Sequence, residues 1–181
     1  MKKIDLKFTN RLINHGPLVV VSARYKARET FTPIAWNMPV EHDPPLVAVC
    51  ISKENFVNSL IKRSKKFCIN ILESPYVREI LKLGELSGRD GDKLKHVRLT
   101  KRKCLKIDVP YLAESSAVIE CRLVRDVSLG DVDIFIGRAL YSQANEKFKT
   151  DLWDPIQLKT IHHLGKNVFA TIIKLESFDT H

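Results

Sequence analysis

Residues 30–55, TFTPIAWNMPVEHDPPLVAVCISKEN, decide the fold of this chain. The stretch joins an apolar segment carrying Trp36, the rigid step Pro44-Pro45 and an unbroken apolar run over residues 46–51. A buried strand that brings polar groups to a helix start suits a phosphate, and an apolar wall with a Trp suits a flat ring. The stretch therefore predicts a seat for a phosphorylated planar ligand. The polar residues that follow the apolar run are Ser52, Lys53 and Asn55.

Length and composition predict a globular protein with a single domain over residues 1–181. The chain is 44% hydrophobic and 28% charged, without the bias of disordered sequences. Its net charge of +9 favours anionic partners. Nucleic-acid binding would call for exposed aromatics between basic residues, but aromatics are only 8% of the chain. Because several phenylalanines also lie in apolar runs, we expect no nucleic-acid partner; they are Phe31, Phe67, Phe135 and Phe169.

The cysteines and the chain start predict a cytoplasmic protein. The four cysteines show no CxxC and no metal-like spacing, and three lie in apolar runs where a thiol acts as a small hydrophobe. This usage fits a reducing compartment. The start, MKKIDLKF, lacks the apolar region of a signal peptide, and no apolar run could span a bilayer. We expect neither a membrane association nor a metal site.

The hydrophobic pattern predicts more strands than helices. Helical spacing covers residues 54–65 and 74–84, the second ending at Gly84. A basic stretch over 97–111 is expected to be partly structured and to end at Pro110, and residues 142–166 to be irregular. Strands are expected over residues 17–25, 30–37, 46–51, 67–72, 117–127, 132–136 and 168–175.

Details of the later strands can be read from alternation. In the strand over 117–127, Glu120, Arg122 and Asp126 should face solvent. Residues 129–131 predict a hairpin turn, and a shift in the alternation at Gly137 predicts a β-bulge. With six or seven strands and two helices that do not alternate, the chain is expected to form a mostly antiparallel barrel with helical additions. Neither a GxGxxG nor a P-loop motif is present.

Six separated segments resemble, in order and spacing, the flavin reductase-like family of FMN-binding split barrels, and its flavoredoxin branch in particular. The resemblance implies a six-stranded antiparallel Greek-key split barrel that binds FMN near the interface of a homodimer. It also implies hydride transfer from NADH or NADPH to flavin, or service as an electron carrier. The segments are PIAWNMPV, DPPLVAVCIS, LIKRSKKFCINIL, SGRDGDKL, IECRLVRDVSLGDVDIFIG and HHLGKNVF.

Family positions that contact FMN can be carried over onto this sequence by the same resemblance. The segment that lines the isoalloxazine implies Thr30, Thr32, Ala35, Trp36 and Asn37. The strand end and turn that hold the ring edge and phosphate imply Cys50, Ile51, Ser52, Lys53 and Asn55. The loop and the C-terminal segment near the cofactor imply Ser87, Gly88, Lys93, His163 and Gly165.

The sequence departs from the family at several of these positions. Ser52 and Asn55 replace arginines that are common in the flavoredoxin branch, and Thr30 stands where many relatives have Asn. Pro33 and Val57 also replace hydroxyl residues. Fewer polar contacts to the phosphate are therefore expected, and Lys53 could compensate as a point charge.

Each site residue also has a structural explanation. The polar group at 52–55 could be a helix N-cap, and Trp36 taken alone is more typical of a core. Cys50 lies in an apolar strand without a nearby His, which favours packing over nucleophilic chemistry. His162 and His163 point oppositely on a strand, so they do not predict a metal site. The cluster over 101–103, or Arg98, could meet the 2′-phosphate of NADPH on charge alone.

Hydride transfer needs no protein acid or base, because the cofactor carries the chemistry, so no catalytic residue is predicted. The first functional hypothesis is an NAD(P)H:flavin oxidoreductase. The alternative is a flavoredoxin-like FMN electron carrier reduced by a protein partner. A third, a basic nucleic-acid-binding β-barrel, would be colourless and would bind nucleic acid in a salt-dependent way.

Overall fold

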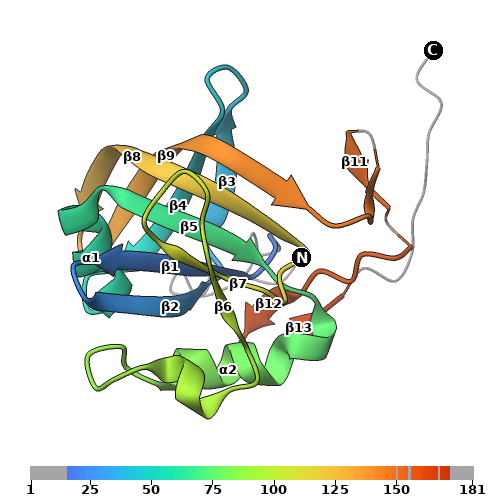
Figure 1. Ribbon diagram of the computed structural model, residues 1–181, viewed down its shortest axis with the longest axis horizontal. Helices are drawn as coiled ribbons and strands as arrows, with labels where there is room; N and C mark the ends of the chain where they lie inside the picture. The colour runs from blue at the N-terminus through green and yellow to red at the C-terminus, as the bar shows by residue number, and fades with distance from the viewer. Residues whose placement is uncertain (1–15, 150, 155, 167, 172–181) are drawn as a thin grey trace, which may run out of the picture.

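The computed structural model describes residues 16–149, 151–154, 156–166 and 168–171. Its centre is a seven-stranded antiparallel sheet in the order β2-β1-β5-β8-β9-β4-β3, which curls into a barrel (Figure 1). Because β2 also contacts β4, the sheet bends back on itself, and β3 remains as an edge strand. The predicted mostly-β antiparallel barrel is confirmed, with one strand more than the six expected. The strands are β1 (Val19–Tyr25), β2 (Arg28–Ile34), β3 (Asn37–Glu41), β4 (Leu46–Ser52), β5 (Lys66–Ile71), β8 (Ala117–Leu129) and β9 (Val132–Ala144).

The expected strand over 30–37 is in fact two strands. β2 begins at Arg28, so the first hairpin turn is only Lys26-Ala27, and the chain leaves the sheet at Ala35-Trp36 before β3 begins. β3 then pairs with β4, with Asn37 opposite Val49. This break separates Trp36 from the barrel core.

The barrel interior is filled by apolar side chains from every central strand. β-branched residues of β1 alternate with outward-facing ones, and rings from β5 and β9 close the centre. Each of the large rings is fully buried, as their apolar context predicted. The interior residues include Val19, Val21, Val49, Ile51, Phe67 and Phe135.

Helix α1 (Phe56–Ser64) covers one open side of the barrel and confirms the expected helix over 54–65, with boundaries two and one residues shorter. Its apolar face adds Val57, Leu60 and Ile61 to the interior. Beside this face, Asp133 of β9 is fully buried and accepts hydrogen bonds from Asn58, at 2.8 Å, and from Lys62, at 2.7 Å. A buried carboxylate therefore fixes the helix to the sheet. Burial alone would raise the pKa of Asp133, but these bonds and one from Ser128 outweigh it and lower the pKa.

Helix α2 (Val77–Glu85) follows the short 3-10 turn η2 (Ser74–Tyr76) and packs on β2 (Figure 1). Its inner residues Ile80 and Leu83 join Phe31 in a second apolar cluster. The prediction that Gly84 stops the helix is wrong, because Gly84 lies inside the last turn and Leu86 is the C-cap. Gly84 instead packs near the Pro33 ring, which a Cβ would reach at 3.8 Å.

The segment over 86–112 has more order than its composition suggests. It contains η3 (Lys93–His96) and the two-stranded sheet of β6 (Lys101–Lys103) and β7 (Pro110–Leu112). The prediction that Pro110 ends the basic stretch is wrong. Pro110 is instead the first residue of β7, a position in a strand that suits proline. The segment is tied to β8 by Glu120, which was expected to face solvent. It is buried instead, since it accepts hydrogen bonds from three backbone N–H groups, those of residues 105, 106 and 107.

The β8–β9 hairpin turns at Gly130, whose φ of 49° suits glycine, as the predicted turn requires. The predicted bulge lies beside Gly137, but the extra residue is Val124 of β8, opposite the step from Ile136 to Gly137. A side chain at position 137 would collide with the Phe67 ring. The shift in the alternation therefore reflects both the bulge and the close packing of the Gly137 backbone against the Phe67 ring.

After β9 the chain crosses back toward α2. It passes through β10 (Phe148–Lys149), β11 (Leu152–Trp153), β12 (His162–Gly165) and β13 (Val168–Ala170). Glu73 holds this crossing, because its carboxylate accepts hydrogen bonds from Ser116, Lys147 and the backbone N–H of Lys159. The predicted strand over 168–175 is confirmed as far as residue 170, and residues 172–175 lie outside the described part. No helix in the described residues is long and apolar enough to cross a membrane.

Candidate functional site

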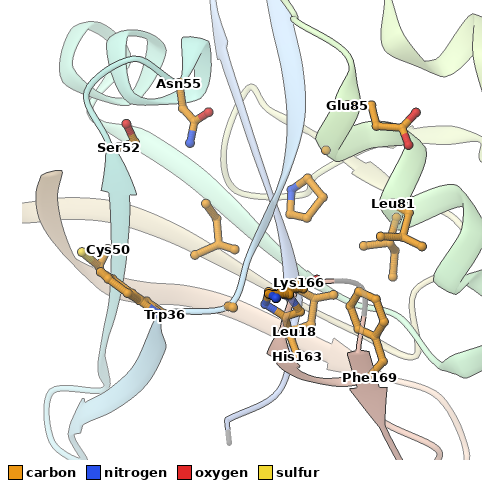
Figure 2. Close-up of a pocket in the computed structure, with 15 residues that line it drawn as sticks. Leu18, Trp36, Cys50, Ser52, Asn55, Leu81, Glu85, His163, Lys166 and Phe169 are labelled. Carbon is orange, nitrogen blue, oxygen red and sulfur yellow. The ribbon is translucent and has the colours of Figure 1, made fainter. Parts of the chain in front are cut away.

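A pocket of about 530 Å³ lies between the end of β2, the β4–α1 junction, α2 and the β12–β13 hairpin (Figure 2). This volume is typical of cofactor sites. Six of the residues predicted to hold a cofactor line it, although they come from three separate segments: Ala35, Trp36, Cys50, Ser52, Asn55 and His163. The fold therefore brings together Trp36, Ser52 and Asn55, three of the four positions on which the prediction of a planar, phosphorylated ligand was based.

One wall is the Ala35-Trp36 step between β2 and β3. Cys50 N–H donates to the Trp36 carbonyl at 2.9 Å, so this step is held against β4. Trp36 is 44% exposed and lines the pocket. The expectation that Trp36 taken alone belongs to the core is wrong, because the chain has already left the sheet at this point.

Cys50 lies next to Trp36 in the same wall (Figure 2). Burial and the nearby Asp133 carboxylate raise the pKa of its thiol. A raised pKa disfavours the reactive thiolate. Cys50 is thus suited to packing against a ligand and unsuited to nucleophilic attack, as its apolar strand indicated.

The β4–α1 junction supplies Ser52 and Asn55. Asn55 occupies the N-cap position of α1 without a side-chain cap bond, and Ser52 Oγ accepts only a long 3.3 Å bond from Glu54 N–H. The side chains of both residues line the pocket rather than cap the helix. Lys53 does not line it, since its ammonium donates to the Gly130 carbonyl at the β8–β9 turn. The position of Lys53 leaves this end without the point charge that the sequence suggested.

The opposite wall comes from the β12–β13 hairpin. His163 packs against Phe169 with ring centroids 5.1 Å apart, and its Nε2 lies 2.8 Å from the Lys166 carbonyl. All three residues line the pocket, and Lys166 adopts a positive φ of 50° at the turn. The hairpin is held in place by the Leu18 N–H, which donates to the Ile161 carbonyl at 2.7 Å.

Sequence reasoning missed the contribution of α2 to the wall and, apart from His163, that of the hairpin. Leu81 and Glu85 of α2, together with Lys166 and Phe169, line the pocket. The helical period predicted that α2 is apolar on one side. It did not show that Leu81, next to the buried residues of this helix, lines a pocket. The order of the chain gives no signal that α2 meets the C-terminal hairpin.

Two predicted residues outside the pocket lining, Thr30 and Gly88, lie against each other. Thr30 is 2% exposed, and its Oγ1 has no hydrogen-bond partner among the described residues. A Cβ placed on Gly88 would collide with this hydroxyl and would lie 3.0 Å from the Phe56 ring. The backbone at Gly88 therefore needs glycine, and beside it lies a buried hydroxyl whose hydrogen-bonding capacity is not used by the described residues.

Lys93 is buried, and no acidic side chain of the described residues pairs with it. Its ammonium donates to the carbonyls of Phe31, at 3.0 Å, and Leu83, at 2.8 Å, and joins the 86–96 loop to β2 and α2. Burial lowers its pKa from 10.5 to about 8. Lys93 thus supports the loop from behind, and it does not line the pocket.

The other predicted residues support the pocket from its surroundings. The Asn37 amide donates to the Pro17 carbonyl at 2.8 Å, and Ser87 Oγ accepts from Arg89 N–H at 3.2 Å. Thr32, Ile51 and Gly165 are buried outside the lining.

The basic cluster over 101–103 is not part of this site. Lys101 pairs with Glu29 at 2.5 Å, and the cluster lines a separate cavity with Arg24. Arg98 is exposed and also lies outside the pocket lining. Among the described residues, no group of three His, Cys, Asp or Glu side chains could hold a metal ion.

Residues 11–162 match the sequence model of the family described as flavin reductase like domain. This chain belongs to the flavin reductase-like family. The chain is similar in sequence to the uncharacterized protein YddH of Escherichia coli, with 32% identity over 175 residues that cover 93% of each chain. The FMN reductase (NADH) RutF of Bradyrhizobium diazoefficiens is 27% identical over 104 residues, which cover 58% of this chain and 56% of that protein.

Solved structures agree with the family and with the fold. An FMN-binding protein from Thermus thermophilus superposes with a TM-score of 0.78 and 26% identity, over 91% of this chain and 90% of that one. The flavoredoxin of Desulfovibrio vulgaris (Miyazaki F) superposes with a TM-score of 0.86 over 98% and 97% of the two chains, at 24% identity. The flavin reductase-like split barrel is thereby confirmed, and the chain shares its fold with a flavoredoxin.

The residues of this flavin reductase-like protein fit FMN on two observations. The pocket presents apolar and aromatic walls suited to a flat ring, at Trp36 and at Phe169. Near its α1 end, the Thr30 hydroxyl is a buried polar atom that has no partner among the described residues, and a Cβ at Gly88 would collide with it. An apolar pocket that carries the polar side chains of Ser52 and Asn55 at its α1 end suits a ring with a sugar-phosphate chain attached.

Proposed function

We propose that this protein binds FMN in the pocket and acts as an NAD(P)H:flavin oxidoreductase. The observation that carries the proposal is the meeting of Trp36, Ser52, Asn55 and His163 around one cavity of cofactor size. The family of flavin reductase-like domains adds support. FMN, when bound, would supply the hydride-accepting chemistry, which needs no acid or base from the protein.

Each wall has a defined task in this proposal. Trp36 and the β4 strand bound one side of the ring, with Cys50 as a neutral packing group. His163 and Phe169 bound the other side, and Lys166 brings a positive charge to the pocket. A cation there would favour the negative charge that develops when the flavin is reduced. The Thr30 hydroxyl and the Ser52 and Asn55 side chains would hold the polar tail.

We further propose that the protein is a homodimer. Trp36, directly before the edge strand β3, and Met38 and Val40 within it are exposed by 44%, 60% and 41%. An apolar edge strand is a surface that soluble proteins normally cover. A second copy of the chain on this face would also close the Trp36 side of the pocket. We extend the proposal to one domain over residues 1–181 and to a cytoplasmic location, which suits four free thiols.

Steady-state turnover tests the enzymatic part. Purified protein should oxidise NADH or NADPH when FMN is added, at a rate proportional to protein, and Trp36→Ala should lower the FMN affinity. A protein that holds FMN but oxidises neither nucleotide would contradict the reductase and leave the alternative, a flavoredoxin-like carrier reduced by a protein partner. The similarity of the fold to a flavoredoxin favours that alternative.

A further inference from the structure

Two guanidinium groups lie over the same phenyl ring beside the pocket. Arg28 begins β2 and Arg89 lies in the loop after α2, yet their Cζ atoms are 4.7 and 5.6 Å from the centroid of the Phe56 ring. Phe56 is the first residue of α1 and directly follows Asn55, which lines the pocket. Both arginines therefore stack on the residue that directly follows the polar end of the pocket.

Backbone carbonyls hold both groups in place. Arg28 Nη2 donates to the carbonyls of Gly88, at 3.3 Å, and Arg89, at 3.0 Å. Arg89 Nη1 donates to the Glu54 carbonyl at 2.6 Å. Within the described residues these bonds use one terminal nitrogen of each guanidinium, and a guanidinium has five N–H donors. Most of the donors of each group remain for a ligand.

The charges of the pair are not balanced by acidic side chains. In the part of the chain that the structure describes, no carboxylate oxygen lies within 4.0 Å of Arg28 or Arg89. Two cations on one ring repel each other, and an anion between them would relieve that repulsion. Independently, the Thr30 hydroxyl lies against Gly88, whose carbonyl Arg28 binds, and has no hydrogen-bond partner within the described ranges. A cationic pair and a spare buried hydroxyl thus lie at one place.

The position relative to the pocket follows from both flanking walls. Asn55 precedes Phe56, and Glu85 is the last residue of α2, directly before the loop that carries Gly88 and Arg89. Figure 2 shows Asn55 and Glu85 on opposite sides of the pocket, both far from Phe169. A ligand with its ring near Trp36 could extend a tail toward this end.

We infer that Arg28 and Arg89 form a clamp for the phosphate monoester of a nucleotide bound in the pocket. The inference rests on the proposed function for the ring and adds the residues that select its phosphate. Planar guanidinium groups match phosphate oxygens better than an ammonium does. The pair supplies the cations that Ser52 and Asn55 do not provide. Two ligands carry this chemistry, FMN through its 5′-phosphate and NADPH through its 2′-phosphate.

Binding titrations with and without the phosphate test the clamp. The dissociation constants of FMN and riboflavin are measured by flavin fluorescence, and those of NADPH and NADH by nucleotide fluorescence, for the wild type and for Arg28→Gln and Arg89→Gln. Arg63→Gln is the matched control, because Arg63 is exposed and stacks over Tyr25, 5.9 Å from the ring centroid, away from the pocket. Circular dichroism and thermal unfolding establish that each variant is folded.

The wild type should bind FMN at least about tenfold more tightly than riboflavin, a factor that corresponds to about 1.4 kcal/mol. Arg28→Gln and Arg89→Gln should each remove most of this difference between FMN and riboflavin, and should change the dissociation constant of riboflavin by less than about threefold. Arg63→Gln should change neither dissociation constant. If the ratio lost is instead that of NADPH to NADH, the clamp holds the dinucleotide. Equal wild-type affinity for phosphorylated and unphosphorylated forms of both ligands would overturn the clamp, while the proposed function would survive. Failure of the wild type to bind any flavin would instead contradict the proposed function.

If either arginine variant fails to fold, the wild type still decides the matter. Inorganic phosphate should compete with FMN and leave riboflavin binding unchanged, and the affinity for FMN should fall with salt more steeply than that for riboflavin. If the clamp holds the dinucleotide, phosphate should instead compete with NADPH and leave NADH binding unchanged. Phosphate that competes equally with phosphorylated and unphosphorylated forms, or with none of these ligands, would overturn the clamp.

Discussion

Replacing Thr30 by Val should have opposite effects on the stability of the free protein and on its affinity for FMN. The Thr30 hydroxyl is buried, with 2% of the residue exposed, and has no partner among the described residues. A buried hydroxyl without a hydrogen bond costs about 1–3 kcal/mol. Valine has the same shape and suits a strand, so T30V should stabilise the apoprotein by about 1 kcal/mol. For a chain of this size that is a rise in Tm of about 2–4 °C.

The same substitution removes a polar contact that we assign to the cofactor. One lost hydrogen bond of about 1.4 kcal/mol lowers the FMN affinity about tenfold. Thermal unfolding of the apoprotein and a fluorescence titration with FMN measure the two effects. Thr160→Val is the control, because its buried hydroxyl lies 3.0 Å from His162 Nε2 and its loss should destabilise the protein. A T30V protein that is less stable and binds FMN unchanged would refute the reasoning, since the hydroxyl would then be structural.

Three further substitutions test the fold around the pocket. Gly137→Ala places a methyl against the Phe67 ring, 2.5 Å from Cζ, and should cost about 1–3 kcal/mol in urea unfolding; Phe67→Leu in the same background should recover part of it, and additive losses would contradict the contact. Lys62→Met leaves the buried Asp133 carboxylate without its cation and should cost about 3 kcal/mol at pH 7. Because the folded pKa of Asp133 is lowered, that loss should shrink as the pH falls below about 4, and a loss independent of pH would contradict the pairing. Lys93 has a folded pKa of about 8, so the unfolded chain binds more protons than the folded protein between pH 8 and 10.5. The free energy of unfolding of the wild type, relative to that of Lys93→Met, should therefore rise across that window by up to about 3 kcal/mol. A difference that does not change with pH would show that burial does not shift the pKa of this lysine.

Local pattern predicted the elements that carry their own signal. The helix over 54–65 and the strands over 46–51 and 67–72 were found within two residues, because period and composition agree there. Errors occurred where a contact from elsewhere in the chain decides the outcome. Glu120 reads as a solvent residue by alternation, but three backbone N–H groups from the 105–107 segment bury it.

The site was predicted in part for the same reason. Ser52 and Asn55 could be placed from one stretch of sequence, since a strand that ends at a helix start has a local signature. Lys53 also has that signature, yet the Gly130 carbonyl of a distant hairpin takes its ammonium away from the pocket. Arg28 and Arg89 are 61 residues apart and meet only because β2 and the loop after α2 lie together over α1. No periodicity or spacing in one sequence reports such a meeting.

Titration of the purified apoprotein with FMN, followed by its visible spectrum and fluorescence, tests the central claim most directly. We predict saturable uptake of one FMN per chain, with a perturbed flavin spectrum and quenching of the Trp36 emission, and a weaker response in Trp36→Ala. A protein that takes up no FMN even with the nucleotide in large excess would contradict the account.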